Sequence, residues 1–309
     1  MDGVSASVVI GLAVLLVAWI FFKSRHGSSD QKLKLPPGPR PLPIIGNLHM
    51  LGKLPHRKLR ELSKKYGPIM FLRLGSVPTV VASTPEMAKE FLKTHDLNFA
   101  SRPATCAGKY VTYNSTDVGF APYGPYWRKM RMVCMLELLS AKRIESMKFI
   151  REEEIAVMRE RIMKQCGVNG SNPVNVSKVV STYATDIICR MAFGRKYSEE
   201  TLTDSRGFKI MIQEVFYVGG EVNIGDFIPY LEWMDLQGLR RRQKHIHKVF
   251  DDFFEKIIQE HVENKSRDHR DFVDVMLQLS EDNTMDIEIT RDNIKAVILV
   301  CILHSILRG

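Results

Sequence analysis

Residues 120–131 read FAPYGPYWRKMR, and this stretch carries the most specific chemical pattern in the chain. On a helix that begins near Pro125, Trp127 and Arg131 are four residues apart and therefore share a face. The indole N–H and the guanidinium are both hydrogen-bond donors, and neither can accept. Such a pair suits a carboxylate or phosphate of a buried ligand. The alternative is a cation–π pair on the helix surface.

After this stretch the pattern is almost entirely helical. It predicts a long helix over residues 140–166, capped by Ser140, and a second helix over 176–193. A third helix is predicted near 239–262, where one apolar stripe faces away from a basic face. The stripe consists of Ile246, Val249, Phe250, Phe253, Phe254, Ile257 and Ile258. A final helix should begin near Asp292.

The segment before the stretch predicts a smaller mixed region. A helix is expected over residues 56–66, followed by a hairpin of two short strands at 69–74 and 79–82. Thr84 should cap the next helix and Thr290 the last one of the chain. The fold class is therefore mainly α with a small β element.

The N-terminus predicts a membrane anchor over residues 1–23. Residues 4–22 include no charged side chain, and a helix of that length rises about 28 Å, close to the hydrocarbon thickness of a bilayer. A cleaved signal peptide, the alternative, would have a basic start, whereas this chain has Asp2 before the run and Lys23 after it. The positive-inside rule then places the rest in the cytosol.

Residues 24–45 are polar and then proline-rich, with LPPGPRPLP at 35–43. Proline fixes φ and lacks an N–H, so this hinge should be a stiff, extended spacer; a ligand for an SH3-like domain is the alternative. Asn-x-Ser/Thr triplets would be glycosylation sites in a lumenal protein, but a cytosolic body does not meet the transferase. They lie at Asn114, Asn169, Asn175 and Asn264.

Composition narrows the classes of function. The net charge of +9 fits nucleic acid, an anionic membrane surface or an acidic protein. The run RRRQK at 240–244 has no interleaved aromatic residues, so a solvated helix face is favoured and no nucleic acid is expected. The five cysteines form no CxxC pair, and His245 and His247 point to different sides of a helix. No metal site is predicted from these residues.

Taken in order, several landmarks resemble the N-terminal portion of a cytochrome P450 of the plant A-type (flavonoid-hydroxylase-like) group, from the anchor to about Leu299. The landmarks are PPGP at 36–39, YGP at 66–68, FASRP at 99–103, YGPYWRKMR at 123–131, DFIP at 226–229 and DVML at 274–277.

The resemblance implies a P450 fold and haem b as cofactor, with Trp127 and Arg131 hydrogen-bonding a haem propionate. It also implies a small lipophilic substrate held partly by residues 102–117 and 208–220. NADPH electrons would arrive through a cytochrome P450 reductase that meets the basic face near Lys129. The protein would sit in the endoplasmic reticulum membrane as a single-pass protein of secondary metabolism.

The chain also departs from the family pattern. None of its five cysteines lies in the family's Phe-x-x-Gly-x-Arg-x-Cys-x-Gly haem-ligand motif, and the Glu-x-x-Arg pair and the oxygen-activating turn have no counterpart. We expect residues 46–299 to form a partial P450 body and residues 300–309 to be a divergent tail. That tail is either a foreign ending or a genuine divergent helix end.

The sequence therefore predicts a fragment of a haem-thiolate monooxygenase, inactive as written and without catalytic or metal-binding residues of its own. A non-catalytic, membrane-bound decoy that binds the reductase or a lipophilic ligand is the alternative. A lumenal binding protein is a third reading.

Overall fold

The computed structural model describes residues 35–167, 170, 172–197, 208–264, 270–282 and 288–308. The predicted anchor over residues 1–23, and the hinge up to residue 34, lie outside the described residues. Within the described ranges, no helix combines the length and apolar character needed to cross a membrane. By its contacts the chain forms two compact units, residues up to 96 with 227–229, and residues 97–226 with 230–309.

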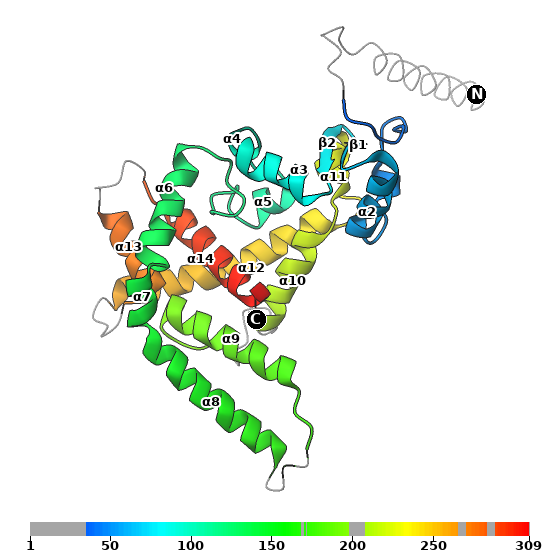
Figure 1. Cartoon of the computed structure of the whole chain (residues 1–309). Coiled ribbons are helices and arrows are strands. Elements are labelled where there is room, and N and C mark those ends of the chain that lie inside the picture. The colour runs from blue at the N-terminus through cyan, green and yellow to red at the C-terminus, as the bar shows by residue number, and fades with distance from the viewer. Residues whose placement is uncertain are drawn as a thin grey trace, which may run out of the picture. The chain divides into compact units, whose positions relative to one another are not determined.

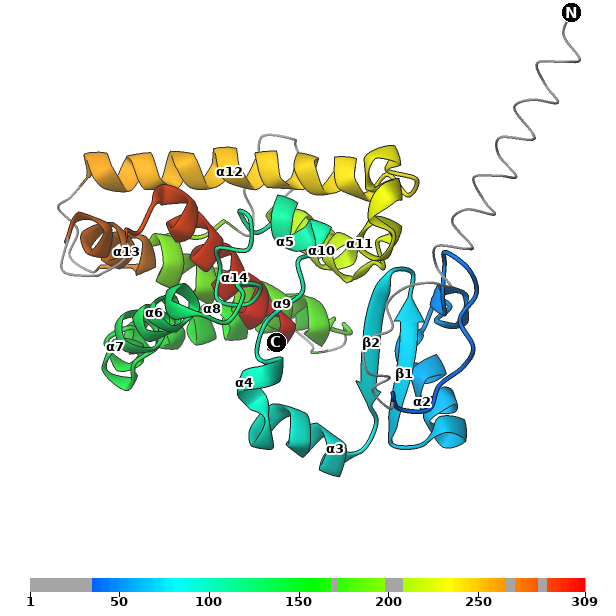
Figure 2. The same ribbon diagram turned by 90° about the horizontal axis from the view of Figure 1, so that it is seen from above.

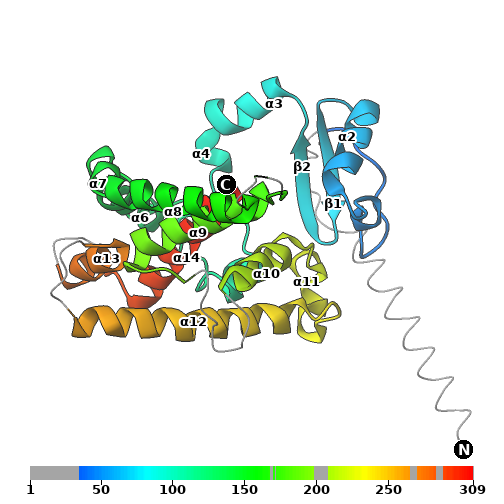
Figure 3. The same ribbon diagram turned by 90° about the horizontal axis from the view of Figure 1, so that it is seen from below.

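The first unit is built on a two-stranded antiparallel sheet. Strand β1 (Ile69–Leu74) pairs with β2 (Val77–Ala82), and α2 (Pro55–Tyr66) lies against β1 (Figure 3). The unit also holds η1 (Leu48–Met50), α3 (Pro85–Lys89) and η2 (Glu90–Thr94). The predicted helices and hairpin are confirmed, and Thr84 caps α3 by accepting from the Met87 N–H.

One strand begins earlier than the sequence predicts, because the turn consists of Gly75 and Ser76 alone. Pro78 lies inside β2, opposite Arg73. In a sheet of two strands each strand is an edge, so the N–H that proline lacks is not needed. Gly75 has a φ of 58°, and a Cβ there would come within 2.3 Å of the Phe227 carbonyl oxygen. A side chain at position 75 would therefore disturb the turn.

The second unit is helical in its described residues (Figure 1). In chain order it holds α5 (Cys106–Tyr110), α6 (Pro125–Val133), η3 (Cys134–Leu138), α7 (Ala141–Ser146), α8 (Lys148–Cys166), α9 (Val176–Phe193), α10 (Phe208–Gly220), α12 (Leu239–Glu263), α13 (Phe272–Glu281) and α14 (Arg291–Arg308). Three short elements include the positions in the sequence at which one unit gives way to the other or directly follow them: α4 (Asp96–Phe99), α11 (Ile224–Phe227) and η4 (Pro229–Met234). Helix α9 lies between α8 and α14.

The core of this unit is formed largely by α12 and α14. Helix α12 extends along one side of the unit (Figure 2), and its predicted apolar stripe is buried throughout. Helix α14 adds Ile294, Val297, Ile298 and Ile302 to the same core. The helix continues through residue 300 without a break, so the predicted divergent tail begins inside α14.

The single long helix predicted over residues 140–166 is wrong. Ser140 does act as a cap, but it caps the short helix α7, which ends at Ser146. Met147 has φ −100° and ψ 15°, outside the helical region, and α8 begins immediately afterwards. Met147 and Ile150 are both buried in the core.

Candidate functional site

Helix α6 carries the two residues that the sequence singled out. Pro125 occupies the first turn, where its missing N–H has no consequence. Trp127 and Arg131 share a face as predicted, and the Arg131 guanidinium lies over the indole, 5.3 Å from the ring centroid. The cation–π pair that the sequence left open is therefore formed, and it holds an exposed guanidinium in a defined place.

The indole N–H has a partner within the chain. Trp127 Nε1 donates to the Val118 carbonyl oxygen at 2.9 Å. In the structure, then, the two predicted donors have different surroundings, because the indole N–H already has a partner whereas the Arg131 side chain is exposed. Among the described residues no carboxylate pairs with Arg131, so its charge is available to an external anion.

The loop that receives the indole is fixed by Asp117. This side chain is fully buried, and its Oδ1 accepts from the backbone N–H groups of Gly119 and Phe120. Burial raises the pKa of Asp117, although these hydrogen bonds oppose the change. Because the Val118 carbonyl and the Gly119 N–H belong to one planar peptide group, the hydrogen bond to Asp117 also sets the direction of this carbonyl.

Tyr126 connects α6 to the beginning of α14. Its hydroxyl donates to the Thr116 carbonyl oxygen at 2.6 Å and accepts from Asn293 Nδ2 at 2.9 Å. Asn293 Oδ1 in turn accepts from the backbone N–H and the hydroxyl of Thr290. Thr290 caps α14 as predicted, since its hydroxyl accepts from the Asn293 N–H. Asp117, Tyr126 and Asn293 were missed as site residues, because their partners are distant in the sequence or are backbone groups.

The exposed face of α6 continues into η3 as an apolar surface. Met135, Leu136 and Leu139 remain 49%, 59% and 43% exposed. Met135 and Leu139 follow Arg131 at intervals of four residues, so the guanidinium lies at one end of an apolar strip. This combination fits a flat apolar ligand with an anionic edge.

A second polar cluster holds the loop between α5 and α6. Tyr113, Asn114 and Ser115 have φ values of 52°, 59° and 58°, a conformation that non-glycine residues seldom adopt. The Tyr113 hydroxyl donates to Asp251 at 3.1 Å. Lys295 Nζ, almost fully buried, donates to the same carboxylate at 2.7 Å. The loop is therefore fastened to α12 and α14.

The ionisation of this cluster is set by competing effects. Burial disfavours the Lys295 charge, but Asp251 and Glu255 outweigh it and raise the pKa of Lys295. Burial likewise opposes ionisation of Asp251, yet Lys295 and the Tyr113 hydroxyl outweigh it and lower the pKa. Hydrogen bonding to Lys295 lowers the pKa of Glu255 despite its partial burial. The cluster is thus a charged network at neutral pH.

Comparison with known proteins decides the family. The family model described as "Cytochrome P450" matches residues 36–305.

The chain belongs to the cytochrome P450 family.

Its plant relatives include "Cytochrome P450 750A1" of Pinus taeda, 47% identical over 92% of this chain and 56% of the relative. "Cytochrome P450 71AP13" of Prunus mume is 42% identical over 96% of this chain and 57% of the relative. "Phenylacetaldehyde oxime monooxygenase CYP71AN24" of Prunus mume is 39% identical over 94% and 55%. The chain thus spans about half the length of the curated relatives it matches.

The residues of this P450 chain fit a haem propionate at α6, since Arg131 is exposed beside an apolar strip and lacks a carboxylate partner among the described residues. The cysteines do not fit as iron ligands. None of the five lies in the ligand motif of the family, and Cys106, Cys134 and Cys189 are buried. Cys134 and Cys189 are buried, which confirms their prediction as core residues.

A cluster that the sequence did not suggest lies at the start of α13. His261, Asp271 and Asp274 place possible metal ligands within 4.8 Å of one another. His261 Nδ1 contacts the Ile257 carbonyl oxygen at 2.7 Å, and Nε2 contacts Asp271 at 2.8 Å. Asp271 and Asp274 also form a capping box for α13. The geometry is accounted for by the helix cap, without a metal.

Proposed function

We propose that this chain is the propionate-binding and substrate-loop part of a haem-thiolate monooxygenase of the plant A-type group. The proposal rests on family membership and on one observation, the exposed Arg131 guanidinium held over Trp127 beside an apolar strip. One relative carries the word monooxygenase in its name. When bound, haem b supplies the oxygen chemistry, the insertion of one atom of O₂ into a small lipophilic substrate.

In this proposal each residue of α6 has a separate task. Arg131 donates charge-assisted hydrogen bonds to a propionate. Trp127 holds the guanidinium by stacking against it, and the hydrogen bond to the Val118 carbonyl oxygen fixes the position of the indole. The buried network around Lys295 keeps the loop at residues 113–115 in position as one wall of the substrate pocket.

The remaining parts of the proposal concern partners and location. Arg128 and Lys129 lie on the same short helix and supply positive charge for an acidic, NADPH-fed reductase. Residues 1–23 would anchor the chain in the endoplasmic reticulum membrane, residues 24–45 would form the hinge, and residues 46–299 the P450 body in the cytosol. Residues 300–309 would be a divergent tail.

We further propose that these 309 residues alone bind haem without a thiolate ligand and are inactive. The support comes from the sequence: none of the five cysteines lies in the family's ligand motif. In the purified chain loaded with haemin, reduction under CO should give no band typical of thiolate ligation. A thiolate-type band would contradict this.

The test of the α6 assignment is a titration of haemin against tryptophan fluorescence, in a background with Trp19→Phe and Trp233→Phe so that the signal comes from Trp127. Arg131→Gln should weaken haemin binding by about tenfold, because it removes one charge-assisted interaction. Arg159→Gln is the matched control, since it removes one exposed arginine from α8. Equal affinities of the two variants would refute the propionate role of Arg131.

A further inference from the structure

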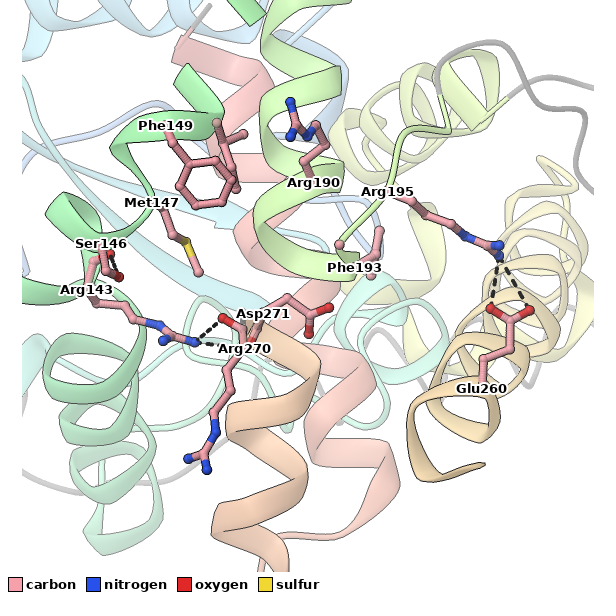
Figure 4. A pocket seen from close by; sticks show the side chains of 12 residues that line it. Arg143, Ser146, Met147, Phe149, Arg190, Phe193, Arg195, Glu260, Arg270 and Asp271 are labelled. Atoms are coloured by element: carbon pink, nitrogen blue, oxygen red, sulfur yellow. Dashed lines mark hydrogen bonds and ion pairs between the residues drawn. The ribbon is translucent and has the colours of Figure 1, made fainter. Parts of the chain in front are cut away.

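A cavity of about 610 Å³ lies between α7, the C-terminal ends of α9 and α12, and the start of α13 (Figure 4). Its apolar lining comes from Met147, Phe149, Ile150 and Phe193. Its polar lining is dominated by four arginines, at positions 143, 190, 195 and 270. Neither Trp127 nor Arg131 lines it, so the cavity is separate from the proposed haem-facing surface. Its size is typical of a site for a small organic molecule.

Two of the four arginines are neutralised by the chain itself. Arg190 donates to Glu153 and Glu154, both at 2.6 Å. Arg195 pairs with Glu260 at 3.1 Å, and Figure 4 shows its guanidinium directed at that carboxylate and away from the middle of the cavity. These two residues shape the walls, and their charges are already balanced.

Arg143 and Arg270 have a different environment. Arg143 Nη2 donates to the carbonyl oxygens of Arg270 and Asp271, at 2.6 and 3.2 Å. Arg270 Nη1 donates to the neutral amide of Gln278 at 2.6 Å. In the ranges that the structure describes, neither guanidinium forms an ion pair with a carboxylate within 4 Å. Burial lowers the pKa of Arg143, and the nearby charge of Arg270 adds to this effect although Asp271 opposes it.

Asp271, the carboxylate of the cavity lining that follows Arg270 in the chain, is engaged elsewhere. Asp271 Oδ2 contacts His261 Nε2 at 2.8 Å, and Oδ1 accepts from the Asp274 N–H at 3.0 Å. Because the Ile257 carbonyl can only accept, the proton between them must be on His261 Nδ1. Asp271 is therefore held by His261 and the Asp274 N–H, and Arg143 and Arg270 have no carboxylate partner within 4 Å among the described residues, while the charges of Asp271, Asp274 and Glu137 act on Arg143 from farther away.

We propose that this cavity binds a small organic anion, with its carboxylate at Arg143 and Arg270 and its apolar body against Met147, Phe149 and Phe193. Arginine favours a planar carboxylate because its fork of N–H donors matches both oxygens. The apolar lining selects an aromatic or branched body over inorganic anions. The site stands independently of the proposed haem chemistry, because it shares no residue with α6.

The experiment titrates 2-naphthoate, and its uncharged isostere 2-naphthamide, into the purified chain by calorimetry. We expect saturable binding of naphthoate, at least tenfold weaker binding of naphthamide, and weaker naphthoate binding at high salt. Arg270→Gln should weaken naphthoate binding about tenfold, whereas Arg241→Gln, which removes a highly exposed arginine of α12, should leave it unchanged. Circular dichroism and thermal unfolding confirm that both variants fold.

A second variant tests the place of binding without altering charge. Ser146 is exposed and lines the cavity, so Ser146→Trp should block the cavity and abolish binding of both probes. Three results would each overturn the proposal: no saturation up to about 5 mM naphthoate, equal binding of the acid and the amide, or equal affinities in Arg270→Gln and Arg241→Gln. Unchanged binding by Ser146→Trp would place the ligand elsewhere and overturn it as well.

Discussion

Helices α6 and α12 show how differently two amphipathic helices of one unit can use their apolar side chains. On α12, Phe250, Phe254 and Ile258 are at most 1% exposed. On the continuation of α6 into η3, Met135 and Leu136 remain 49% and 59% exposed. The buried apolar face of α12 stabilises the fold. The exposed apolar face beside Arg131 does not, and it indicates a surface that binds a ligand or a partner. The following predictions test this contrast, from the largest effect to the smallest.

The largest loss of stability is expected in the buried face of α12. Phe254→Ala should lower the free energy of unfolding by about 3–5 kcal/mol, because it removes a fully buried ring and leaves a cavity. Met135→Ala, on the exposed face, should change it by no more than about 0.5 kcal/mol. Denaturant unfolding followed by circular dichroism measures both. Similar losses in the two variants would remove the contrast between the helices.

The second largest loss of stability is expected in the charged network that holds the loop at residues 113–115 against α12 and α14. Lys295→Met should cost about 2 kcal/mol near neutral pH, less than a fully buried pair because Asp251 and Glu255 are 36% and 42% exposed. It leaves two carboxylates without their shared cation. Urea unfolding of the variant beside Lys248→Met, an exposed lysine of α12, gives the comparison.

The same network sets a pH dependence. The pKa values of Asp251 and Glu255 are lowered below 3.8 and 4.5, so their stabilisation is present above those values and is lost as the pH falls through the folded-state pKa. The pKa of Lys295 is raised above 10.5, so its contribution is lost only as the pH rises through that higher value. We expect the unfolding free energy of the wild type to fall more steeply below pH 4.5 than that of Lys295→Met. Parallel pH profiles of the wild type and Lys295→Met would show that the network contributes nothing to the pH dependence of the unfolding free energy.

A smaller effect is expected where α6 is tied to α14. Tyr126→Phe removes the hydroxyl between Thr116 and Asn293 and should cost about 1 kcal/mol. Since the same loop receives the indole of Trp127, the tryptophan emission should also change. Tyr183→Phe, on α9, is the control and should alter neither quantity. An unchanged emission in Tyr126→Phe would show that the hydrogen bonds of Tyr126 do not control the surroundings of the indole.

The smallest effect on stability is expected at the residue with the largest proposed role in binding. Arg131→Gln should change the free energy of unfolding by no more than about 0.5 kcal/mol, because its side chain is exposed and only stacks on Trp127. Chemical denaturation measures it on the same sample used for haemin titration. A large loss would show that Arg131 supports the fold, and the binding result would then need the folded fraction as a correction.

Local sequence patterns predicted the elements whose partners lie close along the chain. Helix α9 occupies residues 176–193 as expected, and α12 follows from the spacing of its apolar stripe. Caps such as Thr84 are also local, because the hydroxyl reaches an N–H three residues away. The helix expected over 140–166 is divided at Met147, whose backbone leaves the helical region, and no glycine or proline in residues 140–150 signals this break.

By itself, then, the sequence determined the helical class, the small hairpin, and the shared face of Trp127 and Arg131, since all of these depend on spacing of a few residues. Only the tertiary structure decided which donors have partners. Trp127 meets a carbonyl nine residues away, Lys295 meets Asp251 44 residues away, and Arg143 reaches the backbone at Arg270 across 127 residues. Such pairs are set by how helices pack in space, and periodicity along the chain carries no information about them.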